Sequence, residues 1–172
     1  MQGFTGVIIE VDLTTGSYKS ILLDTIVYKR FLGGRGLATY LLSKNYGHSW
    51  RELDPLSPEN PLIIATGPLT GYYPGVKIII SGKSPQSNGI IGSAVSTELG
   101  IELKAAGYDA IIVKGASDSP VYIYVEDGKI EIRDASDLWG LTGRKFIERI
   151  AEFFKKEHGY ERPPGMIYIG PA

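Results

Sequence analysis

Glycine and proline interrupt this chain so often that only short strands and helices fit between them. Among its 172 residues are 22 glycines and 10 prolines, and both residue types disfavour the interior of a regular element. The stretches between these breaks are rich in Val and Ile, which is typical of buried β-strands. Turn residues at 14–16 and 127–128 join such stretches as hairpins. The sequence therefore predicts an α+β fold, in which a mixed or mainly antiparallel sheet with a few helices forms one domain over residues 1–172.

Hydrophobic periodicity gives the approximate bounds of these elements. Apolar runs predict strands at residues 7–12, 17–23, 62–65, 77–81, 90–95, 110–113, 121–125, 129–133 and 166–169. Apolar residues at three-to-four spacing predict helices at residues 25–41, 97–106 and 142–157. Gly33, Gly34 and Gly36 would each cost about 1 kcal/mol inside the first helix. They predict either a break between two helices or a close approach by another backbone or a ligand.

Composition excludes several classes of protein. The chain has no cysteine, so it can hold no disulfide, thiol nucleophile, cysteine-bound zinc or thiolate-bound iron–sulfur cluster by itself. A net charge of −1 offers no basic surface for nucleic acid. No apolar run approaches the roughly 20 residues that span a bilayer, and no secretory signal is visible. We therefore expect a cytoplasmic protein with no nucleic-acid or membrane partner, and the scarcity of Met, Asn and Gln is typical of thermophiles.

Two glycine motifs resemble nucleotide-binding loops but are incomplete. Residues 82–84 match the end of a P-loop, yet Lys77 stands where the pattern needs its first glycine. A surface turn is the better interpretation of these three residues. Residues 34–36 begin a dinucleotide fingerprint, but Thr39 replaces its third glycine and no strand precedes it.

Side chains alone suggest no catalytic set. Neither His48 nor His158 lies near a candidate nucleophile in the sequence, and Glu98 and Glu102 are expected on a solvated helix face. What remains is a series of glycine-rich loops at strand ends, at residues 33–36, 67–75 and 82–92. Such loops bring backbone N–H groups close to a large ligand such as a phosphate. Tight turns in a compact sheet protein explain the same loops equally well, and both interpretations stay open at this point.

The glycine-rich loops belong to longer motifs that follow one another in a fixed order. These motifs are FLGGRGLA (31–38), DPLSPEN (54–60), LIIATGPLTG (62–71), ELKAAGYDAIIV (102–113), VYIYV (121–125) and IGPA (169–172). Together they cover nearly the whole chain and resemble the N-terminal domain of the aldehyde:ferredoxin oxidoreductase family.

The resemblance implies a function for the domain. Enzymes of this family are oxygen-sensitive proteins, mostly of anaerobes, that oxidise aldehydes to carboxylic acids and pass the electrons to ferredoxin. Their sheet-rich N-terminal domain is the base for a tungsten bis-molybdopterin cofactor. The helical domains that carry the iron–sulfur cysteines are missing from these 172 residues. The resemblance therefore implies a domain that is inactive alone, cut from something longer or completed by a separate chain that carries the C-terminal domains.

Site residues can be carried over position by position. The basic residue that contacts the pterin is usually Arg in the family and is Lys77 here. The family's Asn-Ser-Gly-Gly corresponds to residues 94–97, where Ala94 replaces the Asn that helps to hold a magnesium ion, so we expect no magnesium ligand there. The resemblance assigns no catalytic residue and no metal ligand to this chain. It implies cofactor contacts at Lys77, Ser93, Ala94, Val95, Ser96, Gly33, Gly34, Arg35 and Gly36.

The replacement at Ala94 also supports a second hypothesis. A stand-alone relative would keep the fold and use it for self-association or partner binding. The face that would otherwise carry the cofactor and the helical domains would then be an exposed apolar surface, and we expect such a surface to form a homo-oligomer. A third hypothesis, nucleotide binding, rests only on the two incomplete glycine motifs.

Overall fold

A computed structural model of the chain describes residues 3–72 and 76–169. Its strands are β1 (Val7–Asp12), β2 (Ser17–Leu22), β3 (Leu62–Ala65), β4 (Lys77–Lys83), β5 (Ile90–Ser96), β6 (Ala110–Lys114), β7 (Val121–Glu126) and β8 (Lys129–Asp134). Its helices are α1 (Thr25–Phe31), α2 (Gly34–Tyr46), the 3-10 helix η1 (Gly47–Arg51), α3 (Leu99–Ala105) and α4 (Gly143–His158).

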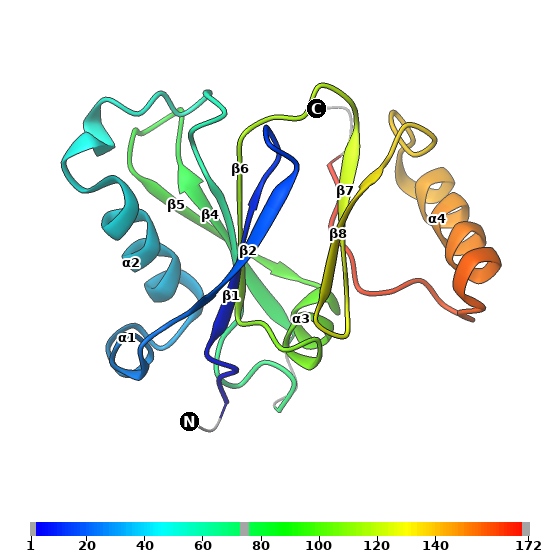
Figure 1. Ribbon diagram of the computed structural model, residues 1–172, viewed down its shortest axis with the longest axis horizontal. Helices are drawn as coiled ribbons and strands as arrows, with labels where there is room; N and C mark the ends of the chain where they lie inside the picture. Colours follow the sequence, from blue (N-terminus) through cyan, green and yellow to red (C-terminus); the bar gives the residue numbers. More distant parts are fainter. Residues whose placement is uncertain (1–2, 73–75, 170–172) are drawn as a thin grey trace.

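Six strands form a central sheet in the order β2-β1-β6-β3-β4-β5. Strands β1 and β6 are parallel, and the other neighbours in this sheet are antiparallel. Helices α1 and α2 cover one face of the sheet, whereas the β7-β8 hairpin lies between the other face and α4 (Figure 1). The predicted α+β fold with a mixed, mainly antiparallel sheet is therefore confirmed.

Both faces of the central strands are buried, which explains their nearly continuous apolar sequences. Neighbouring residues of a strand point to opposite faces. Ile8 and Ile63 therefore pack under α1 and α2, whereas Ile9 and Ile64 pack on the side of α3 and the hairpin. A third cluster joins the hairpin to α4 through Tyr124, Phe146, Ile150 and Phe154.

A buried carboxylate fastens the N-terminal segment to the sheet. Asp109 is 2% exposed and precedes β6. Its side chain accepts hydrogen bonds from the backbone N–H of Thr5 (3.0 Å) and of Gly6 (2.9 Å) and from Lys104 Nζ (2.9 Å). Burial alone would raise the pKa of Asp109, but the bonds from Lys104 and from the two backbone N–H groups outweigh it and lower the pKa. The motif 102–113 thus includes both partners of a buried ion pair.

The expected strand at 166–169 is wrong. Its residues are not paired with any strand in the described part of the chain. Side chains hold this segment instead: Thr97 Oγ1 donates to the carbonyl of Met166 at 3.1 Å, and the Tyr168 ring stacks on Phe146 at 3.9 Å between centroids. These anchors come from other elements, and the apolar run joins no sheet in the described part of the chain. Residues 73–75 of the loop at 67–75 and residues 170–172 of the motif at 169–172 lie outside the described residues.

Candidate functional site

A groove of about 300 Å³ lies where the start of α2 meets the end of β3 and the start of β4. Gly34 and Lys77, two of the residues selected from the sequence, both line it. Residues 67–70 form a third part of the wall, and the full lining is Gly34, Ala65, Gly67, Pro68, Leu69, Thr70, Lys77 and Ile79. The fold thus brings two segments of the predicted cofactor site into one concave surface.

The junction of α1 and α2 brings the backbone of α2 against β3. Leu32 has φ 59° and ψ −54°, and the Gly33 N–H donates to the carbonyl of Phe31 at 2.7 Å. Residues 31–33 therefore form a γ-turn of the rare and strained kind, in which the central φ is positive. Gly33 then takes φ 155°, and a Cβ there would lie 2.7 Å from the carbonyl oxygen of Thr66. The predicted break between two helices at 33–36 is therefore confirmed, and it requires glycine.

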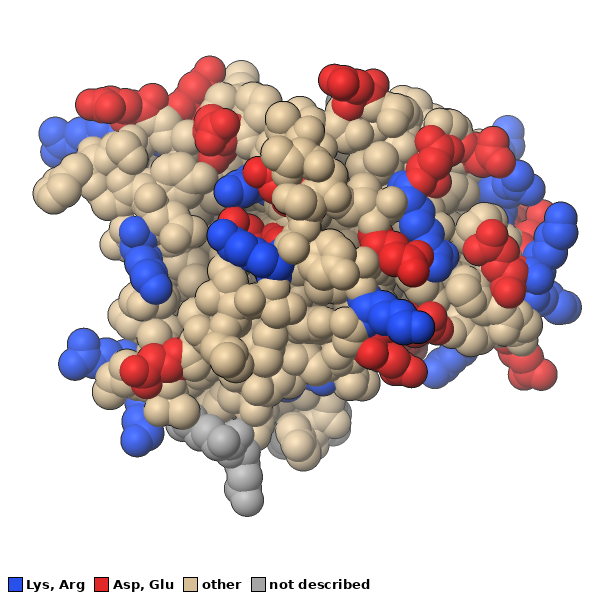
Figure 2. Space-filling model, in the orientation of Figure 1, with Lys and Arg blue, Asp and Glu red and all other residues tan. Residues whose placement is uncertain are grey.

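The electrostatics of the groove favour an anion. The Gly34 N–H donates to the carbonyl of Thr66 at 2.7 Å, but the N-cap residue Gly33 has no side chain to accept from the other first-turn N–H groups of α2. A helix N-terminus carries a partial positive charge, and α2 has no acidic residue in its first turn. Lys77 adds a full positive charge from the opposite wall. On the face of the molecule shown in Figure 2, by contrast, charges of both signs are mixed.

Strand register divides the predicted residues at 93–96 between the two faces of the sheet. Lys77 is opposite Ser96 and Ile79 is opposite Ala94, so these four residues share the face on which α2 lies. Val95 packs in the cluster on the other face, and Ser93 shares that face because of the two-residue period. The geometry therefore places Ala94 and Ser96 on the face of the groove, but not Ser93 and Val95.

Arg35 links the glycine-rich loop directly to β5. Its Nη2 donates to the carbonyl of Gly92 at 2.7 Å. A Cβ at position 92 would lie 2.7 Å from Arg35 Nε, so the glycine gives the guanidinium room to cross the strand. Arg35 thus connects the candidate segment 33–36 to the strand that carries the candidate residues 93–96.

The segment at 82–84 is not a surface turn, so that prediction is wrong. Gly82 and Lys83 continue β4, and Lys83 is only 3% exposed. Its Nζ donates to the carbonyls of Trp50 (2.7 Å) and Leu53 (2.6 Å), at the end of η1. Sequence reasoning missed this role because a lysine beside a glycine looks solvent-exposed, and the carbonyls that bind it lie some thirty residues earlier in the chain.

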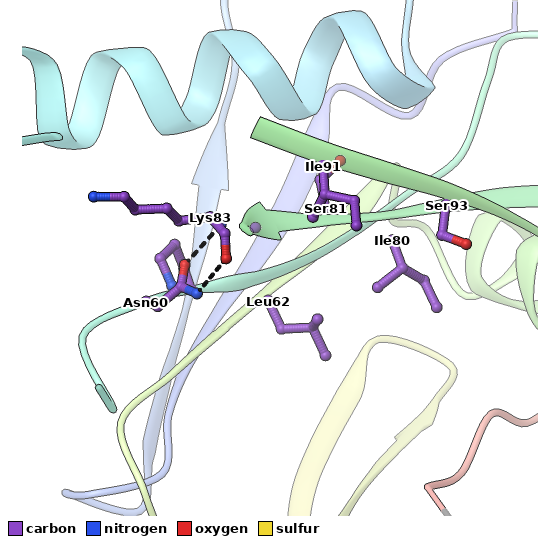
Figure 3. A pocket seen from close by; sticks show the side chains of 9 residues that line it. Asn60, Leu62, Ile80, Ser81, Lys83, Ile91 and Ser93 are labelled. Atoms are coloured by element: carbon purple, nitrogen blue, oxygen red, sulfur yellow. Dashed lines mark hydrogen bonds between the residues drawn. The ribbon is translucent and has the colours of Figure 1, made fainter. Parts of the chain in front are cut away.

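A second, smaller hollow of about 220 Å³ lies on the opposite face of the same strands, where Ile80, Ile91 and Ser93 line it (Figure 3). At its rim, the Asn60 side chain accepts from the Lys83 N–H at 2.9 Å and donates to the Lys83 carbonyl at 3.0 Å. The Lys83 side chain extends away from Leu62 and Ile80 (Figure 3). The hollow is therefore mainly apolar and has no charged group aimed into it.

The remaining candidates from the sequence have structural surroundings. Glu98 is exposed as expected, but Glu102 is half-buried and accepts a hydrogen bond from the Gly165 N–H. His158 stacks on Tyr124 and Tyr160 at the end of α4. Within residues 3–72 and 76–169, no group of three or more His, Cys, Asp or Glu could hold a metal ion. No helix of that part of the chain is long and apolar enough to cross a membrane.

Comparison with known proteins identifies the family. Residues 8–172 match the family model "Aldehyde ferredoxin oxidoreductase, N-terminal domain". The chain is 45% identical to a tungsten-containing aldehyde ferredoxin oxidoreductase of Pyrococcus furiosus over 100% of its own length. It is 48% identical to an aliphatic sulfonate oxidoreductase, WOR-like subunit, of the same organism over 99% of its length. The chain therefore belongs to the aldehyde ferredoxin oxidoreductase family and corresponds to its N-terminal domain.

Solved structures support the same assignment. The active-site complex BamBC of benzoyl coenzyme A reductase, solved with 1,5-dienoyl-CoA, matches 91% of this chain with a TM-score of 0.81 and 37% identity. The chain covers 24% of that protein, and 27% and 28% of the two Pyrococcus relatives. It therefore spans about a quarter of the length of the proteins it resembles.

Proposed function

We propose that this chain is the cofactor-binding portion of a tungsten-containing oxidoreductase, and that the groove between α2 and β4 receives the phosphate end of a tungsten bis-molybdopterin cofactor. One observation carries the proposal: Lys77 and the N-terminus of α2 face the same groove. An ammonium group and unsatisfied backbone N–H groups are the donors that proteins use for phosphate. Pro68 and Ile79 provide apolar walls beside them.

Each residue of the groove has a distinct part in this proposal. Lys77 supplies the positive charge, and Gly34 lets a ligand approach the helix backbone closely because it has no side chain. Ser96 provides a hydroxyl across from Lys77. Ala94 presents only a methyl group, so magnesium finds no side-chain ligand at this position and no step is assigned to it. The donor set thus fits the phosphate of the cofactor but not a magnesium ion held at residue 94.

The proposed reaction needs more than this chain. The chemistry that the bound cofactor supplies is oxidation of an aldehyde to a carboxylic acid, with the electrons passed to ferredoxin. Because the chain spans 27% of a tungsten-containing relative, we propose that the other domains, on a separate chain or in a longer protein, complete the active site. These 172 residues alone are then inactive, and aldehyde-dependent reduction of a viologen by them would contradict that.

Replacing Lys77 by Ala should weaken anion binding in the groove. Inorganic pyrophosphate is the probe, and the amide NMR shifts of residues 33–36 report its position. We expect the dissociation constant to rise at least about tenfold in Lys77→Ala, equivalent to roughly 1.4 kcal/mol. Lys77→Arg should retain most of the affinity because it keeps the charge.

Lys29 offers a matched control because it is also exposed but lies on α1, outside the groove. Lys29→Ala should leave pyrophosphate affinity unchanged. If Lys77→Ala binds pyrophosphate as tightly as the unmodified chain, or if the shifted amides lie away from the start of α2, the groove is not the phosphate site.

A further inference from the structure

The turn between β4 and β5 contains an Asn-Gly pair, Asn88-Gly89. The side-chain amide of an asparagine can be attacked by the backbone nitrogen of the next residue, and glycine hinders this attack least because it has no side chain. The ring that forms is a succinimide, which water opens to aspartate or isoaspartate. The chain has three asparagines, and their surroundings in the structure differ in what this reaction needs.

Two of the asparagines are poorly placed to cyclise. The residue after Asn60 is Pro61, whose nitrogen carries no hydrogen. The Asn60 side chain is also held at both ends, because it accepts from the Lys83 N–H at 2.9 Å and donates to the Lys83 carbonyl at 3.0 Å. Asn45 lies in α2, and the nitrogen that would attack it belongs to Tyr46, the last residue of that helix. That N–H points along the helix axis into the backbone hydrogen-bond ladder, so it is not free to attack.

Asn88 combines a fixed backbone with an open side chain. Its N–H donates to the carbonyl of Ser84 at 2.8 Å, and its carbonyl accepts from Trp50 Nε1 at 3.2 Å. Its φ is 56°, a region that asparagine enters more readily than most residues. Its side chain is exposed and makes no hydrogen bond to residues 3–72 or 76–169. The attacking group is held loosely, since the Gly89 N–H donates to Ser87 Oγ at 3.3 Å, longer than a usual N–H···O bond.

We propose that Asn88 is a site of spontaneous deamidation in the folded chain. The Gly89 nitrogen forms a bond to Cγ of Asn88, and the side-chain amide leaves as ammonia with the proton that the nitrogen loses. Water then breaks one of the two C–N bonds of the succinimide. One cleavage gives aspartate with an ordinary backbone, and the other gives isoaspartate, in which the backbone runs through the former side chain. Water is the only co-reactant.

The products change the turn in charge and in length. Either product adds a carboxylate, and isoaspartate also adds one carbon to the backbone between β4 and β5. In isoaspartate, the carbonyl that accepts from Trp50 becomes part of the free carboxylate. Because the Trp50 carbonyl binds Lys83 Nζ at 2.7 Å, the change occurs beside the attachment of η1 to β4. The proposal concerns this turn alone and does not depend on cofactor binding.

Peptide mass spectrometry after incubation of the folded chain at mildly alkaline pH tests the proposal. We expect Asn88 to convert to a mixture of aspartate and isoaspartate, whereas Asn45 and Asn60 keep their amides. Gly89→Ala is the matched variant, since a Cβ there would approach only Ser87 Oγ, at 3.4 Å, which is ordinary contact. Its methyl group hinders the attacking nitrogen, so deamidation should be at least about tenfold slower.

A sample unfolded in urea shows whether the fold permits the reaction. Because the Asn88 side chain is open in the structure, its rate in the folded chain should be within about tenfold of the rate in urea. An Asn88 that keeps its amide in the folded chain but loses it in urea would overturn the proposal. So would formation of aspartate without isoaspartate, a Gly89→Ala variant that reacts as fast as the unmodified chain, or equally fast reaction at Asn45 or Asn60.

Discussion

Asp109→Ala should destabilise the chain by about 3–5 kcal/mol, the usual cost of removing one partner of a buried ion pair. The Lys104 side chain is 10% exposed and would lose its carboxylate at 2.9 Å. The backbone N–H groups of Thr5 and Gly6 would lose their acceptor as well. Urea unfolding at neutral pH measures the loss. Asp118→Ala is the control because Asp118 is exposed, and its effect should be within about 0.5 kcal/mol of zero.

The same carboxylate gives the fold a dependence on acid. The pKa of Asp109 is lower in the folded chain than in the unfolded chain, where it is about 3.9. Its stabilising contribution is therefore complete above the unfolded pKa and is lost as pH falls through the lower folded pKa. Asp109→Asn should remove this part of the acid dependence. The free energy of unfolding of both proteins is compared at pH 7 and at a pH well below the folded pKa of Asp109. If the difference between the unmodified chain and Asp109→Asn is the same at both pH values, the account of Asp109 is wrong.

Gly36→Ala should cost about 3 kcal/mol, at the upper end of the range for overpacking. A Cβ at this position would overlap the carbonyl oxygen of Phe31 well inside van der Waals contact. Because the obstacle is backbone at the end of α1, it cannot be relieved by a side-chain rotation. Thermal or urea unfolding should therefore show a large loss, although alanine is otherwise the residue that helices favour most.

Ser43→Ala is the appropriate control, since Ser43 is exposed in the same helix. Ser43→Ala should raise the free energy of unfolding slightly, because alanine has a higher helix propensity than serine. A Gly36→Ala variant as stable as the unmodified chain would mean that α1 and α2 can move apart. The close packing at 33–36 would then not be needed for the fold.

The elements that could be predicted from the sequence are those encoded by local chemistry. The hairpin at Asp127-Gly128 follows from two residues that accept positive φ, 45° and 82° in the structure. Asp24 caps α1 by accepting from the Ile26 N–H at 2.9 Å. The failures are long-range. The run at 166–169 has the composition of a strand, but whether it joins a sheet depends on a free neighbouring strand, which the local sequence does not encode.

In the candidate site, too, the features that could be predicted are local, and those that could not depend on distant parts of the chain. The glycines at 33–36 indicate a close backbone approach, and the structure supplies the approaching group, the carbonyl of Thr66. The segment 67–70 was recognised as a loop but not as the wall of a groove, because its position beside Lys77 depends on the pairing of β3 with β4. Ser93 and Val95 were selected together with Ala94 and Ser96, yet alternation along β5 separates the two pairs. Cofactor binding itself stays a prediction for all of these residues.

Metal content tests the central proposal most directly. Tungsten and molybdenum per chain are measured by plasma mass spectrometry on protein purified anaerobically from its own cells, together with any chain that co-purifies. The proposal predicts close to one tungsten per chain, retained with the domains that complete the enzyme. Absence of both metals from protein that is folded and isolated with those domains would contradict it, and would leave a domain that keeps the family's fold without its cofactor.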